Sequence, residues 1–263
     1  MADYNPVYRR LDRSIRGKSA IITGAANGQG WATSILFAEE GAKVAVTDID
    51  GEKAERVAEE IRRSGGEARA WRLDVSDKDQ VRSVIAEVAE AFGGLDIVVN
   101  NAGLPVGRPF DADDYQEFWT RSLAVNLTGQ ELMASAALPY LRKSSSGRIV
   151  NIASTEAFGA TPRNSAYVAA KHGIVGLTRA LAVEFGREGV TVNCICPGAV
   201  HSLMSSGIPD EHKATFAKRR VPLGRYADPE EIAHMTLSIC LPAASYLNGV
   251  VIPVDGGLTI KNA

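Results

Sequence analysis

Short apolar runs alternate with longer amphipathic stretches along most of the chain, and this alternation constrains the fold more than any other feature. It is typical of β-α-β units, in which helices connect parallel strands. Seven runs are predicted to be strands: 19–23, 43–47, 68–73, 95–99, 148–153, 190–195 and 250–254. Six stretches with helical periodicity lie between them: 31–40, 52–64, 77–92, 115–141, 166–185 and 229–241. We therefore expect an α/β fold in which helices flank a parallel sheet.

Length and pattern predict one domain with two additions. The 263 residues suit a single α/β domain, which we place at 18–263. Residues 1–17 show no apolar period and are expected to form an N-terminal extension. Residues 198–225 have weak periodicity and follow a strand, so we expect a substrate lid there.

Composition excludes several classes of protein. A net charge of −2 argues against a nucleic-acid partner. The chain has neither an apolar run long enough to span a membrane nor a secretory signal. Its three cysteines cannot form a disulfide framework, and Cys194-x-Cys196 without nearby histidines is a poor zinc site. We expect a cytoplasmic protein without a bound metal.

The turn after the first strand has the composition of a nucleotide-binding loop. Gly24, Asn27, Gly28, Gln29 and Gly30 lie between that strand and a helix. Glycine permits positive φ and close approach of a pyrophosphate, and a helix N-terminus offers free N–H groups to the anion. The alternative is a glycine-rich turn without a ligand.

Asp48 indicates which nucleotide the loop would hold. It ends the second predicted strand, 18 residues after Gly30 (48 − 30). A carboxylate at this spacing accepts hydrogen bonds from the ribose 2′-hydroxyl and repels a 2′-phosphate. No Arg or Lys occupies Ala25, Ala26, Asn27 or Ile49, so NAD is predicted over NADP.

Five motifs in order resemble the short-chain dehydrogenase/reductase family over about residues 18–260. They are Thr23-Gly-x-x-x-Gly-x-Gly30, Asn100-Asn-Ala-Gly103, Ser154, Tyr167-x-x-x-Lys171, and Pro197-Gly198 with Val254-Asp-Gly-Gly257. The resemblance implies a doubly wound Rossmann fold with strand order 3-2-1-4-5-6-7 and a nicotinamide cofactor. The short Tyr-to-Lys spacing resembles the members that act on alcohols and carbonyls rather than on enoyl double bonds.

The resemblance also implies catalytic roles. Tyr167 would exchange the substrate's hydroxyl proton, and Lys171, one helical turn away, would lower its pKa together with the oxidised nicotinamide. Ser154 would hold the substrate oxygen. Asn126 matches the family's fourth catalytic residue, whose backbone holds a water that links Lys171 to solvent; alternatively, it is an ordinary helix residue.

Further cofactor contacts are implied position by position. Asp74 and Val75 would flank the adenine, Asn100 would steady the centre of the sheet, and Val200 would meet the nicotinamide carboxamide through its backbone. Ser202 replaces the usual Thr and can still donate a hydrogen bond. The remaining expected contacts are Asn101, Ala102, Gly103, Tyr167, Lys171, Pro197 and Gly198.

The expected activity is the NAD-dependent interconversion of a secondary alcohol and a ketone. An NADPH-dependent ketone or 3-oxoacyl reductase and a catalytically silent nucleotide-binding regulator are the alternatives. The small-molecule substrate stays open among sugars, hydroxy acids, cyclic alcohols and steroids. Glu156 and Arg163 are expected either to contact it or to form a surface ion pair.

An assembly of identical chains is also expected. Small residues recur along the helix predicted at 166–185, where another backbone could approach closely: Ala166, Ala169, Ala170, Gly173, Gly176 and Ala180. The family commonly pairs this helix in dimers and tetramers, so we expect a homo-oligomer, a homotetramer or a homodimer. The alternative is that these residues pack on their own sheet.

Overall fold

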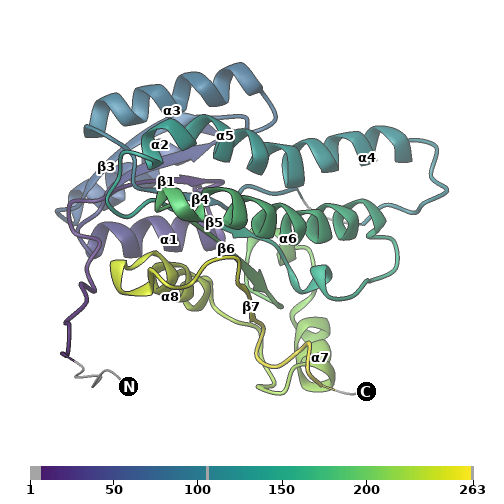
Figure 1. Ribbon diagram of the computed structural model, residues 1–263. Coiled ribbons are helices and arrows are strands. Elements are labelled where there is room, and N and C mark those ends of the chain that lie inside the picture. Colours follow the sequence, from purple (N-terminus) through teal and green to yellow (C-terminus); the bar gives the residue numbers. More distant parts are fainter. Residues whose placement is uncertain (1–6, 105–106, 262–263) are drawn as a thin grey trace.

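A seven-stranded parallel sheet forms the centre of the computed structural model, which describes residues 7–104 and 107–261 (Figure 1). Its strand order is β3-β2-β1-β4-β5-β6-β7, which confirms the expected doubly wound topology. The strands are β1 (Ser19–Thr23), β2 (Lys43–Asp48), β3 (Glu67–Arg72), β4 (Ile97–Asn100), β5 (Arg148–Ile152), β6 (Thr191–Pro197) and β7 (Val251–Val254).

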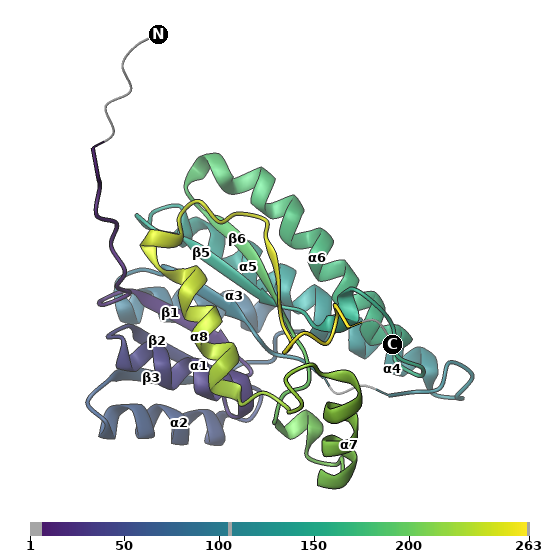
Figure 2. The same cartoon turned by 90° about the horizontal axis from the view of Figure 1, so that it is seen from below.

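Helices cover both faces of this sheet (Figures 1 and 2). Helices α1 (Gly28–Glu39), α2 (Gly51–Arg63) and α8 (Pro229–Cys240) share one apolar cluster with the sheet. Helices α3 (Lys78–Phe92), α5 (Gly129–Leu141) and α6 (Ser165–Phe185) share the cluster on the opposite face. Because both faces are covered, β1, β4 and β5 are buried along their whole length, which explains why most of their residues are apolar.

The sheet topology determines where a ligand can enter. β1 lies between β2 and β4, so the connections that leave β1 and β4 run to opposite faces of the sheet. Such a switch point opens a crevice at the carboxyl ends of the strands. The glycine loop follows β1 at this point, and α1 begins at Gly28. Helix α1 thus begins three residues before the predicted start at residue 31, and Gly28 and Gly30 lie in its first turn.

The single helix expected at 115–141 is interrupted. The structure contains α4 (Tyr115–Leu123), a π-helical turn, η1 (Ala124–Thr128), and then α5. Asn126 lies in this turn, fully buried, and its amide donates to the Ser122 hydroxyl at 3.3 Å. Single π-turns of this kind recur at functional sites.

The segment 198–225 contains a helix that periodicity did not predict. Helix α7 (Asp210–Arg220) follows the short 3₁₀ turn η4 (Leu203–Ser205), and Ala217 is its single buried residue. A helix with one small buried side chain has no apolar stripe to detect.

The N-terminal residues form an irregular arm. Residues 7–16 contain neither helix nor strand, and the arm contacts the body where Ile15 is buried and where Ala243 donates its N–H to the Asp12 carbonyl at 2.8 Å. Residues 1–6 of the expected extension lie outside the described residues. No helix in the described part of the chain combines the length and apolarity needed to cross a bilayer.

Candidate active site

A cavity of about 1270 Å³ opens at the carboxyl ends of the strands and extends from the glycine loop to the segment 198–225. Its volume exceeds the roughly 300–1,000 Å³ typical of a site for one drug-sized ligand. The predicted residues that line it are Gly24, Asn27, Gly28, Gln29, Asp48, Asp74, Val75, Asn101, Ala102, Gly103, Ser154, Tyr167, Lys171, Pro197, Gly198, Val200 and Ser202. One cavity thus brings nearly all of them together.

The glycine loop fits a nucleotide because two of its glycines adopt left-handed backbone conformations. Gly24 has φ +62° and Gly28 has φ +55°, which other residues rarely adopt. The first turn of α1 lines the cavity with Asn27, Gly28 and Gln29, so its free N–H groups lie at the wall. This cradle suits a pyrophosphate.

Gly30 is not among the cavity-lining residues and serves a packing role. A Cβ at this position would lie 2.3 Å from the Gly24 carbonyl oxygen and 2.5 Å from Nδ2 of Asn101. That amide donates to the carbonyls of Thr23 and Gly24 at 2.9 and 3.1 Å. Gly30 therefore allows Asn101 to connect the ends of β1 and β4.

Asp48 lies at the nucleotide end of the cavity with its carboxylate fixed by the backbone. Its Oδ2 accepts the N–H of Ala26 at 3.1 Å, and its Oδ1 accepts the N–H of Asp50 at 3.0 Å. Each carboxylate oxygen can accept more than one hydrogen bond, so both remain able to receive ribose hydroxyls.

Lys53 also lines this end, which the sequence analysis missed. Its ammonium pairs with Asp50 at 2.7 Å. The lysine therefore already has an acidic partner beside Asp48. Its place in the first turn of α2, five residues after Asp48, is the signal that could have revealed it.

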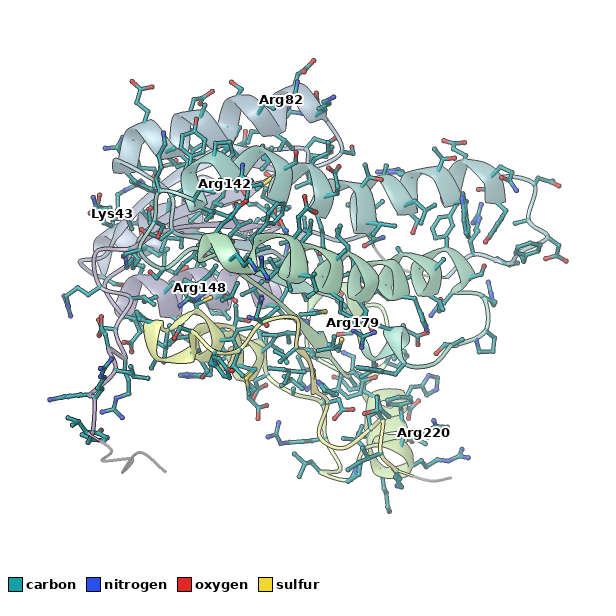
Figure 3. The ribbon with its side chains drawn as sticks, in the orientation of Figure 1. Lys43, Arg82, Arg142, Arg148, Arg179 and Arg220 are labelled. Atoms are coloured by element: carbon teal, nitrogen blue, oxygen red, sulfur yellow. The ribbon has the colours of Figure 1, made fainter. Side chains whose placement is uncertain are left out.

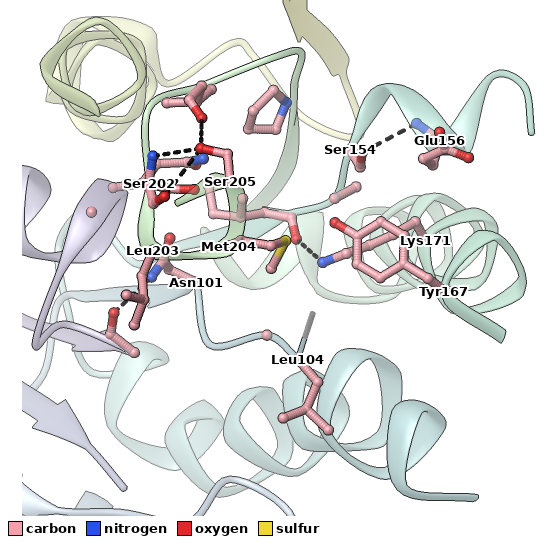
Figure 4. A pocket seen from close by; sticks show the side chains of 18 of the residues that line it. Asn101, Leu104, Ser154, Glu156, Tyr167, Lys171, Ser202, Leu203, Met204 and Ser205 are labelled. Carbon is pink, nitrogen blue, oxygen red and sulfur yellow. Dashed lines mark hydrogen bonds between the residues drawn. The ribbon is translucent and has the colours of Figure 1, made fainter. Parts of the chain in front are cut away.

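Ser154, Tyr167 and Lys171 approach one another at the other end of the cavity (Figure 4). Ser154 follows β5, and Tyr167 and Lys171 occupy the first two turns of α6. Nζ of Lys171 lies 5.3 Å from the Tyr167 ring centroid and donates to the Ile152 carbonyl at 2.9 Å. Both side chains of the Tyr-Lys pair are buried, which excludes a solvated surface pair.

Burial governs the ionisation of this pair in the chain alone. It raises the pKa of Tyr167 to about 12, and the hydrogen bond with Ser154 acts in the opposite direction. Burial lowers the pKa of Lys171 to about 8. A tyrosinate at neutral pH therefore needs added positive charge next to the ring, which an oxidised nicotinamide would supply.

Asn126 does not line the cavity but supports its wall. Its Oδ1 accepts the N–H of Leu104 at 3.1 Å, and Leu104 is a cavity residue. A Cβ on Gly103 would lie 3.1 Å from the same oxygen. Likewise, Asn100 donates to Asn151 at 2.9 Å across β4 and β5. Asn100 thus holds the end of β4 against β5, and Asn126 holds the segment after β4 that carries the cavity residue Leu104.

The loop between Ser154 and Tyr167 separates Glu156 from Arg163. The Glu156 carboxylate accepts the backbone N–H and the hydroxyl of Thr161 and forms no ion pair with Arg163, so the alternative of a Glu156–Arg163 surface pair is not observed. Arg163 has φ +70° and is not among the cavity-lining residues. Substrate recognition by Arg163 is therefore not supported.

Further cavity residues come from segments without a motif. They are Arg121 on α4, Ile208, Phe216 and Arg220 in or near α7, and Leu258, Thr259 and Lys261 in the C-terminal segment. Cys194 and Cys196 are buried, and within the described ranges no cluster of three or more His, Cys, Asp or Glu side chains suits a metal ion.

Comparisons with known proteins agree with this geometry. Residues 24–259 match the profile of a family described as enoyl-(acyl carrier protein) reductase. The chain is 36% identical over 246 residues to the 3-oxoacyl-[acyl-carrier-protein] reductase of Thermotoga maritima, which covers 94% of this chain and 99% of the relative. It is 39% identical over 246 residues to a 2,5-dichloro-2,5-cyclohexadiene-1,4-diol dehydrogenase of Sphingobium indicum, covering 94% and 98%.

A solved structure with NADP bound at low occupancy is similar in fold. It is described as an NAD(P) dependent gluconate 5-dehydrogenase from Beutenbergia cavernae, and it is 35% identical with a TM-score of 0.89. The similarity covers 95% of this chain and all of that one (100%). The relatives thus include alcohol dehydrogenases and a ketone reductase, although the family description names an enoyl reductase.

Proposed function

The chain belongs to the short-chain dehydrogenase/reductase family, and we propose that it is an NAD-dependent dehydrogenase that interconverts a secondary alcohol and a ketone. The observation that carries the proposal is one cavity that contains Ser154, Tyr167 and Lys171 at one end and the glycine loop and Asp48 at the other. A dinucleotide extended between these ends would present its nicotinamide to the serine and the tyrosine. When bound, the nicotinamide supplies the hydride acceptor or donor.

The residues of the chain supply the proton chemistry. As the tyrosinate, Tyr167 takes the proton of the alcohol during oxidation, and its hydroxyl gives that proton back during reduction. Ser154 holds the same substrate oxygen as its charge changes. Lys171 stabilises the tyrosinate, since its ammonium lies near the ring and donates only one of its three N–H groups to Ile152.

NAD is proposed over NADP because of Asp48. A 2′-phosphate would lie against a carboxylate, and Lys53 is already paired with Asp50. The NADP-bound relative and the 3-oxoacyl reductase favour the second candidate, an NADPH-dependent ketone reductase. Comparison of kcat/KM for the two cofactors separates the candidates: NAD should be preferred in the wild type, and Asp48→Ala should bring the values closer. Preference for NADP in the wild type would favour the second candidate.

The proton-transfer assignment is tested with Tyr167→Phe. A screen of secondary alcohols for NADH formation first identifies a substrate. Loss of the acid/base oxygen should then lower kcat by about 10² to 10⁴, while the Kd for NADH, measured by calorimetry, changes only a few fold. Tyr140→Phe removes the same atom from α5, outside this cavity, and is the control. More than a tenth of wild-type kcat in Tyr167→Phe would contradict the assignment.

A further inference from the structure

One side of helix α7 lines the substrate end of the cavity. Phe216 and Arg220 are four residues apart, so they project from the same side of the helix, and both line the cavity. The Phe216 ring packs against Tyr226, with 6.1 Å between ring centroids. Lys218 and Arg219 carry the same charge in the same turn but are not cavity residues. Arg220, labelled beside α7 in Figure 3, is thus the arginine of this turn that lines the cavity.

The walls around this arginine are apolar. Phe158, Leu203, Met204, Ile208 and Phe216 all line the cavity, and each is at least 40% exposed. Figure 4 shows Leu203 and Met204 on the lid, across the cavity from Ser154 and Tyr167. Large apolar side chains that stay exposed together mark a surface that an apolar ligand covers. The skeleton of the substrate is therefore expected to be apolar.

The charges at the substrate end are predominantly positive. Its lining includes Arg121, Arg220 and Lys261, and the single carboxylate is that of Glu156, which bonds Thr161. Across the described ranges, no carboxylate forms an ion pair with Arg220.

Lys261 lies beside the last turn of α7, where its Nζ donates to the Arg219 carbonyl at 2.7 Å. Its ammonium keeps two further N–H groups for a ligand. The helix dipole explains why cations gather in this turn, but it does not explain why one of them faces the apolar cavity.

We propose that Arg220 and Lys261 bind a carboxylate at the far end of an apolar substrate whose secondary alcohol lies at Tyr167. This inference rests on the proposed function and narrows its substrates to hydroxy acids with an apolar ring or chain. Arginine presents a planar pair of N–H groups that matches a carboxylate, and Lys261 can add a third donor. Simple polyols would leave both the apolar walls and the cations without partners.

The experiment compares an acid with its neutral ester. 3-Hydroxycyclohexanecarboxylate and its methyl ester differ in charge but share the ring and the alcohol. The wild type should oxidise the acid with a kcat/KM about tenfold higher, since a charge-assisted hydrogen bond contributes about 1.5–3 kcal/mol and exposure reduces it. The preference should shrink as salt is added.

Variants separate recognition from a general effect of charge. Arg220→Ala should raise KM for the acid about tenfold and KM for the ester much less, and Arg220→Lys should restore part of the preference. Lys218→Ala, which removes a cation from the same turn outside the cavity, should change neither substrate. Equal kcat/KM for acid and ester in the wild type, or equal effects of Arg220→Ala and Lys218→Ala, would overturn the inference.

A binding measurement distinguishes failure of the inference from failure of the proposed function. Cyclohexanecarboxylate is titrated into the complex with NADH by calorimetry, and its Kd should rise about tenfold in Arg220→Ala. Oxidation of neutral alcohols without binding of this acid would reject the carboxylate site alone. Absence of NADH formation from every alcohol, the neutral ones included, would reject the proposed function.

Discussion

Replacing Gly30 by alanine tests whether close packing at the glycine loop maintains the site. The added Cβ would lie 2.3 Å from the Gly24 carbonyl oxygen and 2.5 Å from Nδ2 of Asn101, far inside contact distance. Because one of these atoms is backbone and the other is fixed by two hydrogen bonds, neither can move without loss. The loop must therefore separate from the end of β4.

The expected loss of stability follows from these contacts. Overpacking costs about 1–3 kcal/mol, and each of the two Asn101 hydrogen bonds contributes about 1 kcal/mol. Alanine returns about 1 kcal/mol as a better helix former. The free energy of unfolding should fall by about 3 kcal/mol, which corresponds to a decrease in Tm of about 6–12 °C for a domain near this size.

Thermal unfolding and NADH titration measure the two consequences. Displacement of the loop should also weaken NADH about tenfold or more, that is, by at least about 1.4 kcal/mol. Gly207→Ala is the matched control, because a Cβ there meets no atom within 4 Å and its φ is not positive. A Tm within 2 °C of wild type together with an unchanged Kd for NADH would refute the reasoning.

Two further predictions concern pH and assembly. Lys171→Ala should move the acidic limb of the pH profile for alcohol oxidation to higher pH, because loss of the ammonium near the Tyr167 ring raises the pKa of that tyrosine further. A lower rate at every pH without a shift of the limb would indicate a structural role instead. Sedimentation at micromolar concentration should show a dimer or tetramer. In α6, Ala166 and Ala170 pack within the chain, whereas Gly176 and Ala180 are exposed and available to a second copy. A single 28.0 kDa species would refute oligomerisation.

The strands of the sheet could be predicted because burial on both faces favours apolar residues, which the sequence shows directly. Strands covered on both faces are mostly apolar, and the sequence shows short runs of Ala, Ile and Val in β1, β4 and β5. The cavity residues could be located for a related reason. In a parallel sheet the carboxyl ends of all strands lie at one edge, so motifs that follow strands, such as Ser154 after β5, meet there.

The positions of Gly30 and Asn126 could be predicted, but their contacts could not. Spacing places Gly30 in a nucleotide loop, whereas only the structure shows that its missing Cβ makes room for Asn101. The sequence pattern predicts one long helix around Asn126, and it does not reveal the π-turn that the structure contains there. Periodicity indicates which side of a helix or strand is buried. It indicates neither the contact between Gly30 and Asn101 nor the hydrogen bond between Asn126 and Leu104.

The part of the cavity near α7 was the least predictable because its side chains face the cavity and not the core. Leu203, Met204 and Ile208 are apolar yet exposed, so they follow neither the helical nor the strand period that identifies a core. Helix α7 buries only Ala217, and its cavity-facing pair of Phe216 and Arg220 reads as an irregular mixture of apolar and charged residues. A segment that the core does not constrain can change its side chains without loss of the fold. The same freedom that hides α7 from pattern analysis would allow it to determine which alcohol reaches Tyr167, as the proposed carboxylate site requires.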